Sequence, residues 1–456
     1  MHVSIPNFSE NARSAERNFL LKSSRALARW VLLTSKPKSP MNERITLPEN
    51  PIIAKCGTVR LTTAQALVRY LSGLRTRVEG PQGDEIVPLF GGVFAIFGHG
   101  NVAGIGEALY QYRDRLPTYR AHNEQAMAHA AIAYSKAHFG RRIMACTTSI
   151  GPGATNLITA AALAHVNRLP VLFLPGDIFV SRDPDPVLQQ VENFSDGTVS
   201  ANDCFRPVSR YFDRILQPSQ LLTSLPRAVL TLTDPVLCGP ATLALPQDVQ
   251  AAAFDYPAEF FESPVVEFRA APPTDGHMEY GYSCMGYEIA GGLGVKMARP
   301  ECEIIVMLGD GSYLMLNNEI ATSVMLDKKL IIVLLDNRGS GCINRLQQSC
   351  GGNPFNNMLK DCLQFGTGAP DIDFAANAAS LGALSEKVAN IAELEAALRR
   401  ARSANRTYLI CIDTDDTRTT EEGGWWWEVA VPEESPCETV RQARADYLRG
   451  KENQTH

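Results

Sequence analysis

Residues 304–337 read IIVMLGDGSYLMLNNEIATSVMLDKKLIIVLLDN, and this stretch decides the fold class. The runs 304–308 and 330–335 are short, rich in β-branched residues and apolar on both faces, as the buried strands of parallel sheets are. The segment between them, 313–327, is typical of a helix. Strand, helix and strand in this order predict a right-handed crossover, so both strands end at the same edge of one sheet.

Polar residues follow each of these strands, at the sheet edge where α/β proteins bind ligands. Asp310 follows the first strand, and Asn337 and Gly339 follow the second. Their carboxylate, amide and carbonyl oxygens are the hard ligands that Mg²⁺ prefers beside phosphate and water. Glycines allow close backbone approach, and a helix start directs N–H groups at an anion. The residues predicted to border a bound diphosphate are Gly309, Gly311 and Ser312. For Gly-Asp-Gly alone, a simple turn is the alternative.

This spacing resembles the signature of the thiamine diphosphate enzymes, which is GDG followed by Asn-Asn or Asp-Asn about one crossover later. The resemblance implies a second set of residues that activates the aminopyrimidine ring of the cofactor. Within RAHNEQAMAHAAIAYSKA, residues 120–137, Glu124 stands at the start of a small-residue helix. In that family a Glu at this place hydrogen-bonds the ring, so Glu124 is the expected catalytic carboxylate. A residue that merely stabilises the helix dipole is the alternative.

Three further segments extend the resemblance. TSIGPGATN, residues 148–156, is similar to the glycine-rich turn of the pyrimidine-binding domain in these enzymes. YSCMGYEIAGGLG, residues 282–294, resembles the stretch that wedges the cofactor into its bent shape, which assigns the wedge to Met285 and a carbonyl donor to Ser283. Ordinary core packing is the alternative for Met285. The loop FGHGNVAGIG lacks dinucleotide-binding spacing, and its His99 is a possible substrate contact or a solvent-facing histidine.

Composition excludes several classes of function. A net charge of −6 without a basic run argues against a nucleic-acid surface, and no apolar run has the length of a membrane span. Eleven cysteines without a C-x-x-C pair indicate neither a zinc site nor a disulfide framework. We therefore expect a cytoplasmic protein with a small-molecule substrate.

The sequence predicts two doubly wound parallel-sheet domains, one pyrimidine-binding and one diphosphate-binding. Their predicted bounds are 56–250 and 276–456, the second with a C-terminal tail. Residues 251–275 are proline-rich and are predicted to be a linker in place of the central domain that enzymes of this superfamily usually carry. Residues 1–55 are expected to be a disordered extension. The second domain begins late, which predicts an unpaired edge on its sheet.

Within this superfamily the resemblance is closest to the acylhydrolases that open trihydroxycyclohexane-1,2-dione in myo-inositol breakdown. It rests on FGHGNVAGIGEALYQ, the long stretch 175–215, HMEYGYSCMGYEIAGGLG and GCINRLQ. The resemblance implies hydrolysis of a carbon–carbon bond between adjacent ketones, which gives a deoxyuronic acid. It also implies a homodimer or homotetramer with active sites between subunits. An acetolactate synthase-like enzyme and a catalytically silent, shortened chain are the alternatives.

Overall fold

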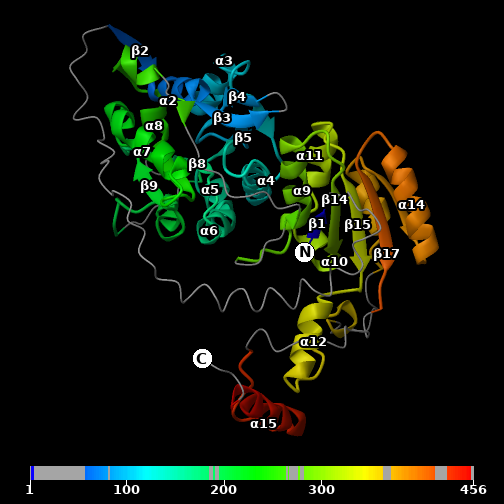
Figure 1. Ribbon diagram of the computed structural model, residues 1–456. Coiled ribbons are helices and arrows are strands. Elements are labelled where there is room, and N and C mark those ends of the chain that lie inside the picture. Colours follow the sequence, from blue (N-terminus) through cyan, green and yellow to red (C-terminus); the bar gives the residue numbers. More distant parts are fainter. Residues whose placement is uncertain are drawn as a thin grey trace, which may run out of the picture.

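The computed structural model describes residues 2–4, 57–80, 83–183, 188–189, 195–262, 265–266, 276–277, 282–362, 371–415 and 429–452. These residues form two α/β units that lie side by side, each built around a six-stranded sheet (Figure 1). The predicted fold class is therefore confirmed. Two small sheets, of two and three strands, accompany the first unit.

The first unit has a fully parallel sheet in the order β6-β5-β7-β8-β10-β9. Strands β7, β8 and β10 are buried along their whole length, which is why they read as nearly continuous apolar runs. The six strands are β5 (Phe90–Ala95), β6 (Thr118–Arg120), β7 (Ile143–Thr148), β8 (Leu172–Asp177), β9 (Tyr211–Arg214) and β10 (Ala241–Pro246).

Helices cover both faces of this sheet, and alternate strand residues pack on opposite sides. In β8, Leu172 and Leu174 join the cluster under α2, α3, α7 and α8, whereas Phe173 joins the cluster under α4 and α6. The helices are α2 (Thr63–Gly73), α3 (Glu107–Gln111), α4 (Glu124–Ala137), α5 (Pro152–Asn156), α6 (Ile158–Val166), α7 (Leu221–Thr233) and α8 (Gln247–Ala251).

Part of the segment expected to be a linker is folded onto the first unit. Strand β11 (Ala253–Pro257) pairs antiparallel with β2 (Thr58–Thr62). Strand β12 (Val265–Val266) pairs with β3 (Arg75–Gly80), which in turn pairs with β4 (Gly83–Pro88). Residues 263–264 and 267–275 lie outside the described residues.

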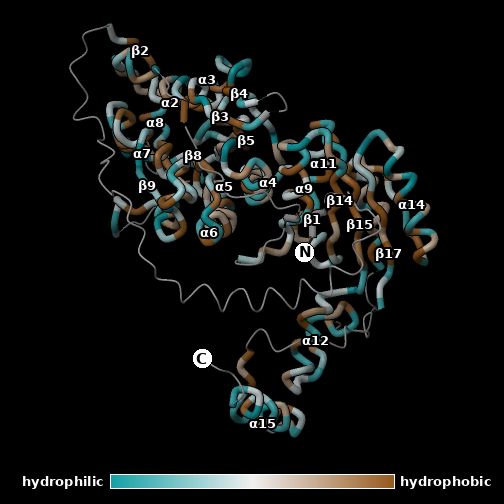
Figure 2. The backbone as a smooth tube through the Cα atoms, in the orientation of Figure 1, coloured by the Kyte–Doolittle hydropathy of each residue, from teal (hydrophilic) through white to brown (hydrophobic). Residues whose placement is uncertain are grey.

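The second unit has the strand order β13-β1-β14-β15-β17-β16, of which the last four are parallel. Its apolar strands lie between more hydrophilic outer helices such as α14 (Figure 2). The parallel strands are β14 (Ile305–Gly309), β15 (Ile331–Asp336), β16 (Leu384–Val388) and β17 (Tyr408–Asp413). The helices around them are α9 (Tyr287–Ala298), α10 (Asp310–Met315), α11 (Glu319–Met325), α13 (Phe374–Ser380) and α14 (Ile391–Ser403).

Two predictions about this unit differ from the structure. The expected open edge is paired, because β1 (His2–Ser4) runs antiparallel to β14 and also pairs with β13 (Gly276–His277). The first residues of the expected disordered extension thus form a strand. In addition, the single helix predicted for 313–327 is two helices, α10 and α11, since residues 316–318 are not helical.

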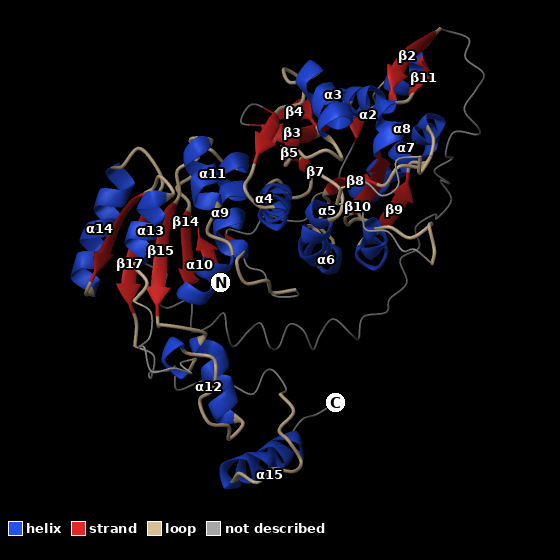
Figure 3. Cartoon of the chain, turned by 180° about the vertical axis from the view of Figure 1, so that it is seen from behind, coloured by secondary structure: helices blue, strands red, loops and turns tan. Residues whose placement is uncertain are grey.

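Two further helices extend beyond both sheets (Figures 1 and 3). Helix α12 (Gly341–Ser349) follows the second strand of the predicted metal site, and α15 (Glu438–Glu452) is the last helix of the described chain. The hydroxyl of Thr439 donates to the carbonyl of Gly351 over 2.6 Å, which ties α15 to the turn after α12.

Candidate functional site

The three predicted metal ligands lie together at the carboxyl ends of β14 and β15. Asp310 begins α10 and is only 2 % exposed, although it carries a carboxyl group. The backbone N–H of Asn337 donates to Asp310 Oδ1 over 3.4 Å. Parallel pairing of Gly309 with Leu335 sets the two strand ends level, so the crossover itself brings these groups together.

The amide group of Asn337 gives a physical test of whether a cation fits here. One of its two terminal atoms faces only acceptors, at 3.1 Å from Asp310 Oδ1 and 2.6 Å from the carbonyl oxygen of Gly339. Turned with its nitrogen inward, the amide donates to both oxygens. Turned with its oxygen inward, it completes a set of three hard oxygens that repel one another unless a cation lies between them. The donor set therefore fits Mg²⁺.

Electrostatics at this corner also favour a cation. Burial raises the pKa of Asp310 above its usual value, and the nearby carboxylate of Asp336 raises it further. A divalent cation would stabilise the charged form of such a carboxyl group. Within the described residues, no group of three or more His, Cys, Asp or Glu side chains is placed to hold a metal ion. The candidate site uses one carboxylate, one amide and one backbone carbonyl instead.

Gly311 lies between the predicted metal ligands and the predicted wedge residue. A Cβ atom at Gly311 would lie 3.6 Å from Met285 Cε, 3.7 Å from Ser340 Oγ and 4.0 Å from the carbonyl of Gly339. Met285 is half-buried, and the end of its side chain lies next to the Gly-Asp-Gly turn; its role as the wedge stays a prediction. Ser283 is exposed. At Gly309 a Cβ would meet only Leu335 O, at 3.9 Å.

A buried glutamate that the sequence analysis did not single out supports the turn between Met285 and α9. Glu288 is 1 % exposed and accepts a hydrogen bond from the N–H of Gly286 over 2.9 Å. Burial raises the pKa of Glu288, although hydrogen bonds from Ser312 and from the backbone lower it. Gly286 has φ of +91°, a backbone shape that glycine adopts without strain. Glu288 thus fixes the turn that carries Met285 and contacts Ser312, which is itself buried.

Glu124 lies at the first position of α4, as predicted, and faces the glycine-rich turn. Its Oε2 accepts a hydrogen bond from Asn156 Nδ2 over 3.0 Å, and a Cβ at Gly153 would lie 3.3 Å from its Oε1. Asn123 caps the helix by accepting from the N–H of Ala126. The side chain of Glu124 is therefore oriented toward α5 by its bond with Asn156. Asn156 was not singled out from the sequence, although it ends the quoted TSIGPGATN segment.

His99 lies on the loop after β5, next to the same turn. A Cβ at Gly98 or Gly100 would collide with Ser149 or Ile150, so this loop packs tightly on the residues before the glycine-rich turn. His99 is half-buried, and its Nε2 has no hydrogen-bond partner among the described residues. The structure thus places His99 beside the turn that contacts Glu124.

One contact joins the Glu124 side of the site to the Met285 side. Gln125 Nε2 donates to Cys284 Sγ over 3.4 Å. Since Gln125 follows Glu124 and Cys284 precedes Met285, the carboxylate and the wedge come from adjoining segments. Met285 in turn lies near Gly311, which follows Asp310 in the chain, so these neighbouring residues connect the Glu124 side of the site with the oxygen cluster at Asp310.

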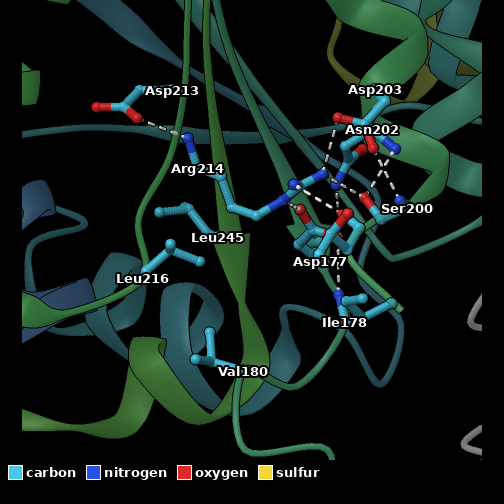
Figure 4. A network of polar contacts seen from close by, with 12 residues as sticks. Asp177, Ile178, Val180, Ser200, Asn202, Asp203, Asp213, Arg214, Leu216 and Leu245 are labelled. Carbon is cyan, nitrogen blue, oxygen red and sulfur yellow. Dashed lines mark hydrogen bonds and ion pairs between the residues drawn. The ribbon is translucent and has the colours of Figure 1, made fainter. Parts of the chain in front are cut away.

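A polar network closes the carboxyl edge of the first sheet, as Figure 4 shows. Arg214 at the end of β9 donates from Nε to Asp177 Oδ2 over 2.7 Å and from Nη2 to Ser200 Oγ over 2.7 Å. Asn202 Nδ2 donates to the carbonyl of Gly176 over 2.8 Å. Burial alone would lower the pKa of Arg214, but Asp177 and Asp203 raise it. The network fixes the stretch after β8 relative to the loop that bears His99, because Gly176 packs on Gly100.

Comparisons with known proteins support the division of the chain into two cofactor-binding units. The model of the thiamine pyrophosphate enzyme, N-terminal TPP binding domain, matches residues 91–196. The model of the thiamine pyrophosphate enzyme, C-terminal TPP binding domain, matches residues 264–412. Together they cover more than half of the chain, one on each α/β unit. Thiamine pyrophosphate is thiamine diphosphate, so the predicted cofactor is confirmed, with Mg²⁺ as its usual partner.

Curated relatives extend the likeness. A protein of Bacillus cereus (strain ZK / E33L) named 3D-(3,5/4)-trihydroxycyclohexane-1,2-dione hydrolase 2 is 28 % identical over 632 positions, which take in 85 % of this chain and 98 % of the relative. A hydrolase of the same name without the number, from Listeria monocytogenes serotype 4b (strain F2365), is 52 % identical over 217 residues, 48 % of this chain and 33 % of the relative.

The Bacillus alignment is much longer than this chain. Its 632 positions include only 85 % of 456 residues, so a long stretch of the relative has no counterpart here. Among the described residues, no helix is long and apolar enough to cross a membrane. The two domain matches and the relatives, all named as hydrolases, lead to one conclusion: the chain is an enzyme that belongs to the thiamine pyrophosphate enzymes.

Proposed function

We propose that this enzyme hydrolyses a carbon–carbon bond in a cyclic 1,2-diketone, converting 3D-(3,5/4)-trihydroxycyclohexane-1,2-dione to 5-deoxy-glucuronate in myo-inositol catabolism. The observation that carries the proposal is the stretch of 217 residues that is 52 % identical to the Listeria hydrolase of that name. Such identity over nearly half of the chain extends far beyond the residues that a shared cofactor requires. The predicted cytoplasmic location and homo-oligomeric assembly are parts of the same proposal.

The residues of the site form two groups, one that would bind the metal and the diphosphate and one around Glu124. Asp310, Asn337 and Gly339 would hold Mg²⁺, which in turn would hold the diphosphate group beside Gly311. Met285 would support the bent cofactor from the adjoining turn. When bound, thiamine diphosphate supplies the nucleophilic carbon and the electron sink of the reaction.

The second group, around Glu124, would control proton transfer at the cofactor. The carboxyl group of Glu124 would hydrogen-bond a ring nitrogen of the aminopyrimidine, and Asn156 orients that carboxyl group by donating to Oε2. His99 is the candidate substrate contact, because it lies on the loop beside the same turn and its buried Nε2 has no hydrogen-bond partner among the described residues. Because the substrate is a small polyol-derived diketone, such single polar contacts are enough to orient it.

We also propose that the chain lacks the central domain of its relatives. The long unmatched stretch in the Bacillus alignment supports this, as does the direct passage from β12 to β13 within residues 265–277. The groups assigned to the cofactor all lie in the two retained units. Cofactor chemistry therefore does not depend on the missing part.

A thermal-shift experiment tests the cofactor site. Purified protein is melted with and without thiamine diphosphate and Mg²⁺, beside an Asp310→Ala variant. A ligand at one hundred times its dissociation constant stabilises by about 2.7 kcal/mol, which raises the melting temperature by several degrees. We expect this shift in the wild type and its loss in Asp310→Ala. No shift in the wild type would identify a silent, shortened chain.

Turnover then separates the candidate reactions. The wild type is supplied with the trihydroxycyclohexane-dione, and ring opening is followed by formation of the acid. Pyruvate is tested in parallel. Consumption of pyruvate with no effect on the dione would favour an acetolactate synthase-like enzyme and would overturn the proposal.

A further inference from the structure

We infer that Arg338 positions two of the predicted Mg²⁺ ligands, the amide of Asn337 and the carbonyl of Gly339. Arg338 stands between them in the chain, so its backbone conformation sets the direction of both. It was not singled out from the sequence. The inference rests on the proposed metal site, and it adds the residue that keeps the ligands of that site in place.

The backbone of Arg338 has a conformation that needs support. Its φ is +62°, in the left-handed region that residues with a side chain rarely adopt. Gly339 follows with φ of +149°, and a Cβ there would lie 2.6 Å from the carbonyl oxygen of Asn357. These two residues make a sharp turn directly after β15, which brings one terminal atom of the Asn337 amide to 2.6 Å from the carbonyl oxygen of Gly339. Backbone strain of this kind persists only where the surrounding structure holds it.

The side chain of Arg338 holds the turn on one side. Its Nε lies 3.2 Å from Asp336 Oδ2, and its backbone N–H donates to Asp336 Oδ1 over 2.9 Å. Its Nη1 donates to Asp371 Oδ1 over 3.1 Å, and its Nη2 lies 3.8 Å from Asp413 Oδ1. Asp336 ends β15 and Asp413 ends β17, so one guanidinium connects two neighbouring strand ends with the loop before α13. Asp371 and Asp413 are exposed, so the pair with buried Asp336 matters most.

The backbone of residues 357–359 holds the turn on the other side. The N–H of Leu359 donates to the carbonyl of Arg338 over 2.9 Å, and the N–H of Ser340 donates to the carbonyl of Asn357 over 2.8 Å. Gly339 lies between these two bonds, which leave its own carbonyl oxygen available for a cation. The turn is therefore fixed by the side chain of Arg338 and by its carbonyl together.

Arg338 also distinguishes the two buried carboxyl groups at this edge of the sheet. Asp310 and Asp336 are each 2 % exposed, and burial followed by the charge of Asp336 raises the pKa of Asp310. The guanidinium of Arg338 pairs with Asp336 and leaves Asp310 for the cation. Without Arg338, a second buried carboxylate would lack its ion-pair partner close to the metal ligands.

Equilibrium dialysis tests the inference on folded protein. Wild type, Arg338→Gly and Arg338→Lys are dialysed against a fixed concentration of thiamine diphosphate and increasing Mg²⁺, and bound thiamine diphosphate is measured. Residues that orient metal ligands typically contribute about 10- to 100-fold to metal affinity, so half-saturation of Arg338→Gly should need that much more Mg²⁺. Arg338→Lys keeps the charge but not the planar fork, and it should lie between the two. The matched control is Arg402→Ala, which removes the ion pair of α14 with Glu303 and should bind like the wild type.

Melting of the ligand-free proteins separates positioning of the ligands from a general loss of stability. Glycine adopts a φ of +62° without strain, so Arg338→Gly should melt near the wild-type temperature although it needs more Mg²⁺. Wild-type half-saturation in both Arg338 variants would overturn the inference. If the wild type bound no thiamine diphosphate, or bound it equally without Mg²⁺, the proposed metal site would fail and the inference with it. Neither readout involves the dione, so failure of the proposed reaction alone would leave the role of Arg338 standing.

Discussion

The close approach of α4 and α9 makes Gly294→Ala the most direct probe of how the two units are joined. A Cβ at position 294 would lie 2.1 Å from the carbonyl oxygen of Ala130 and 2.9 Å from Ala133 Cβ. Non-bonded atoms prefer separations of about 3.5–4.0 Å, so a full relief of the collision would need the helices to move apart by roughly 1.5 Å. Backbone, rather than a flexible side-chain end, is in the way.

The expected magnitude follows from two opposing effects. Overpacking a tightly packed core costs about 1–3 kcal/mol. Alanine stabilises a helix interior by up to about 1 kcal/mol relative to glycine, which offsets part of that cost. The net expectation is a loss of about 1–2 kcal/mol, or about 2–4 °C in melting temperature for each kcal/mol if a unit of about 200 residues melts on its own.

The assay is thermal melting of Gly294→Ala beside Gly450→Ala. Gly450 lies in α15, and a Cβ there would meet no atom within 4 Å, so this control gains helix propensity without any collision. We expect a lower melting temperature and weaker thiamine diphosphate binding for Gly294→Ala, with no loss for the control. A melting temperature at or above that of the wild type in Gly294→Ala would refute the packing of α4 on α9.

Three further predictions concern the site and its supports. Glu124→Gln should keep the cofactor-induced thermal shift but lower turnover by roughly 100- to 10,000-fold, and wild-type turnover would remove Glu124 from the mechanism. Glu319→Ala leaves the N–H of His122 without its acceptor and should cost about 1–3 kcal/mol in denaturant unfolding, whereas Glu319→Gln, which keeps an acceptor oxygen, should recover most of it; equal losses in both would contradict this role. Burial lowers the pKa of His129 from 6.5 to about 3, so the unfolded chain binds a proton that the folded chain excludes. Above pH 6.5 His129 is neutral in both the folded and the unfolded chain. As the pH drops from 6.5 towards 3, the free energy of unfolding falls by about 1.4 kcal/mol per pH unit. His129→Phe should flatten this dependence between pH 6.5 and 4.5 in unfolding experiments, and an unchanged slope would show that other groups cause it.

The sequence was sufficient for features that depend on local pattern. The strands predicted at 304–308 and 330–335 are present as β14 and β15, each displaced by one residue, and α4 begins at Glu124 as predicted. The cluster of Asp310, Asn337 and Gly339 was also predictable, because parallel strands joined by a crossover must end at one edge. These features follow from two short segments and the connection between them.

Other features depend on contacts between distant segments, which no local pattern reports. Glu319 looks like an ordinary first-turn residue, and only the docking of the two units buries it against His122. Asn156 is polar at the end of a short helix, and its role depends on where Glu124 lies. The break between α10 and α11 falls at Leu316, Asn317 and Asn318, and the two asparagines, which favour helix ends over helix interiors, were a local signal that the prediction of one helix passed over. The expectation of an open sheet edge failed because three residues at the chain start were too few to suggest a strand.

That three-residue strand also bears on the order of folding. His2 pairs with Met307, about three hundred residues later in the chain, so the pairing forms only after the central strands of the second sheet are in place. Pairings between such distant residues are slow to form. Until β1 pairs with it, β14 has an unpaired edge that other chains can bind. We therefore expect refolding yield to fall with protein concentration, more steeply for a chain without residues 1–4, and equal yields for both chains would exclude this role of the strand.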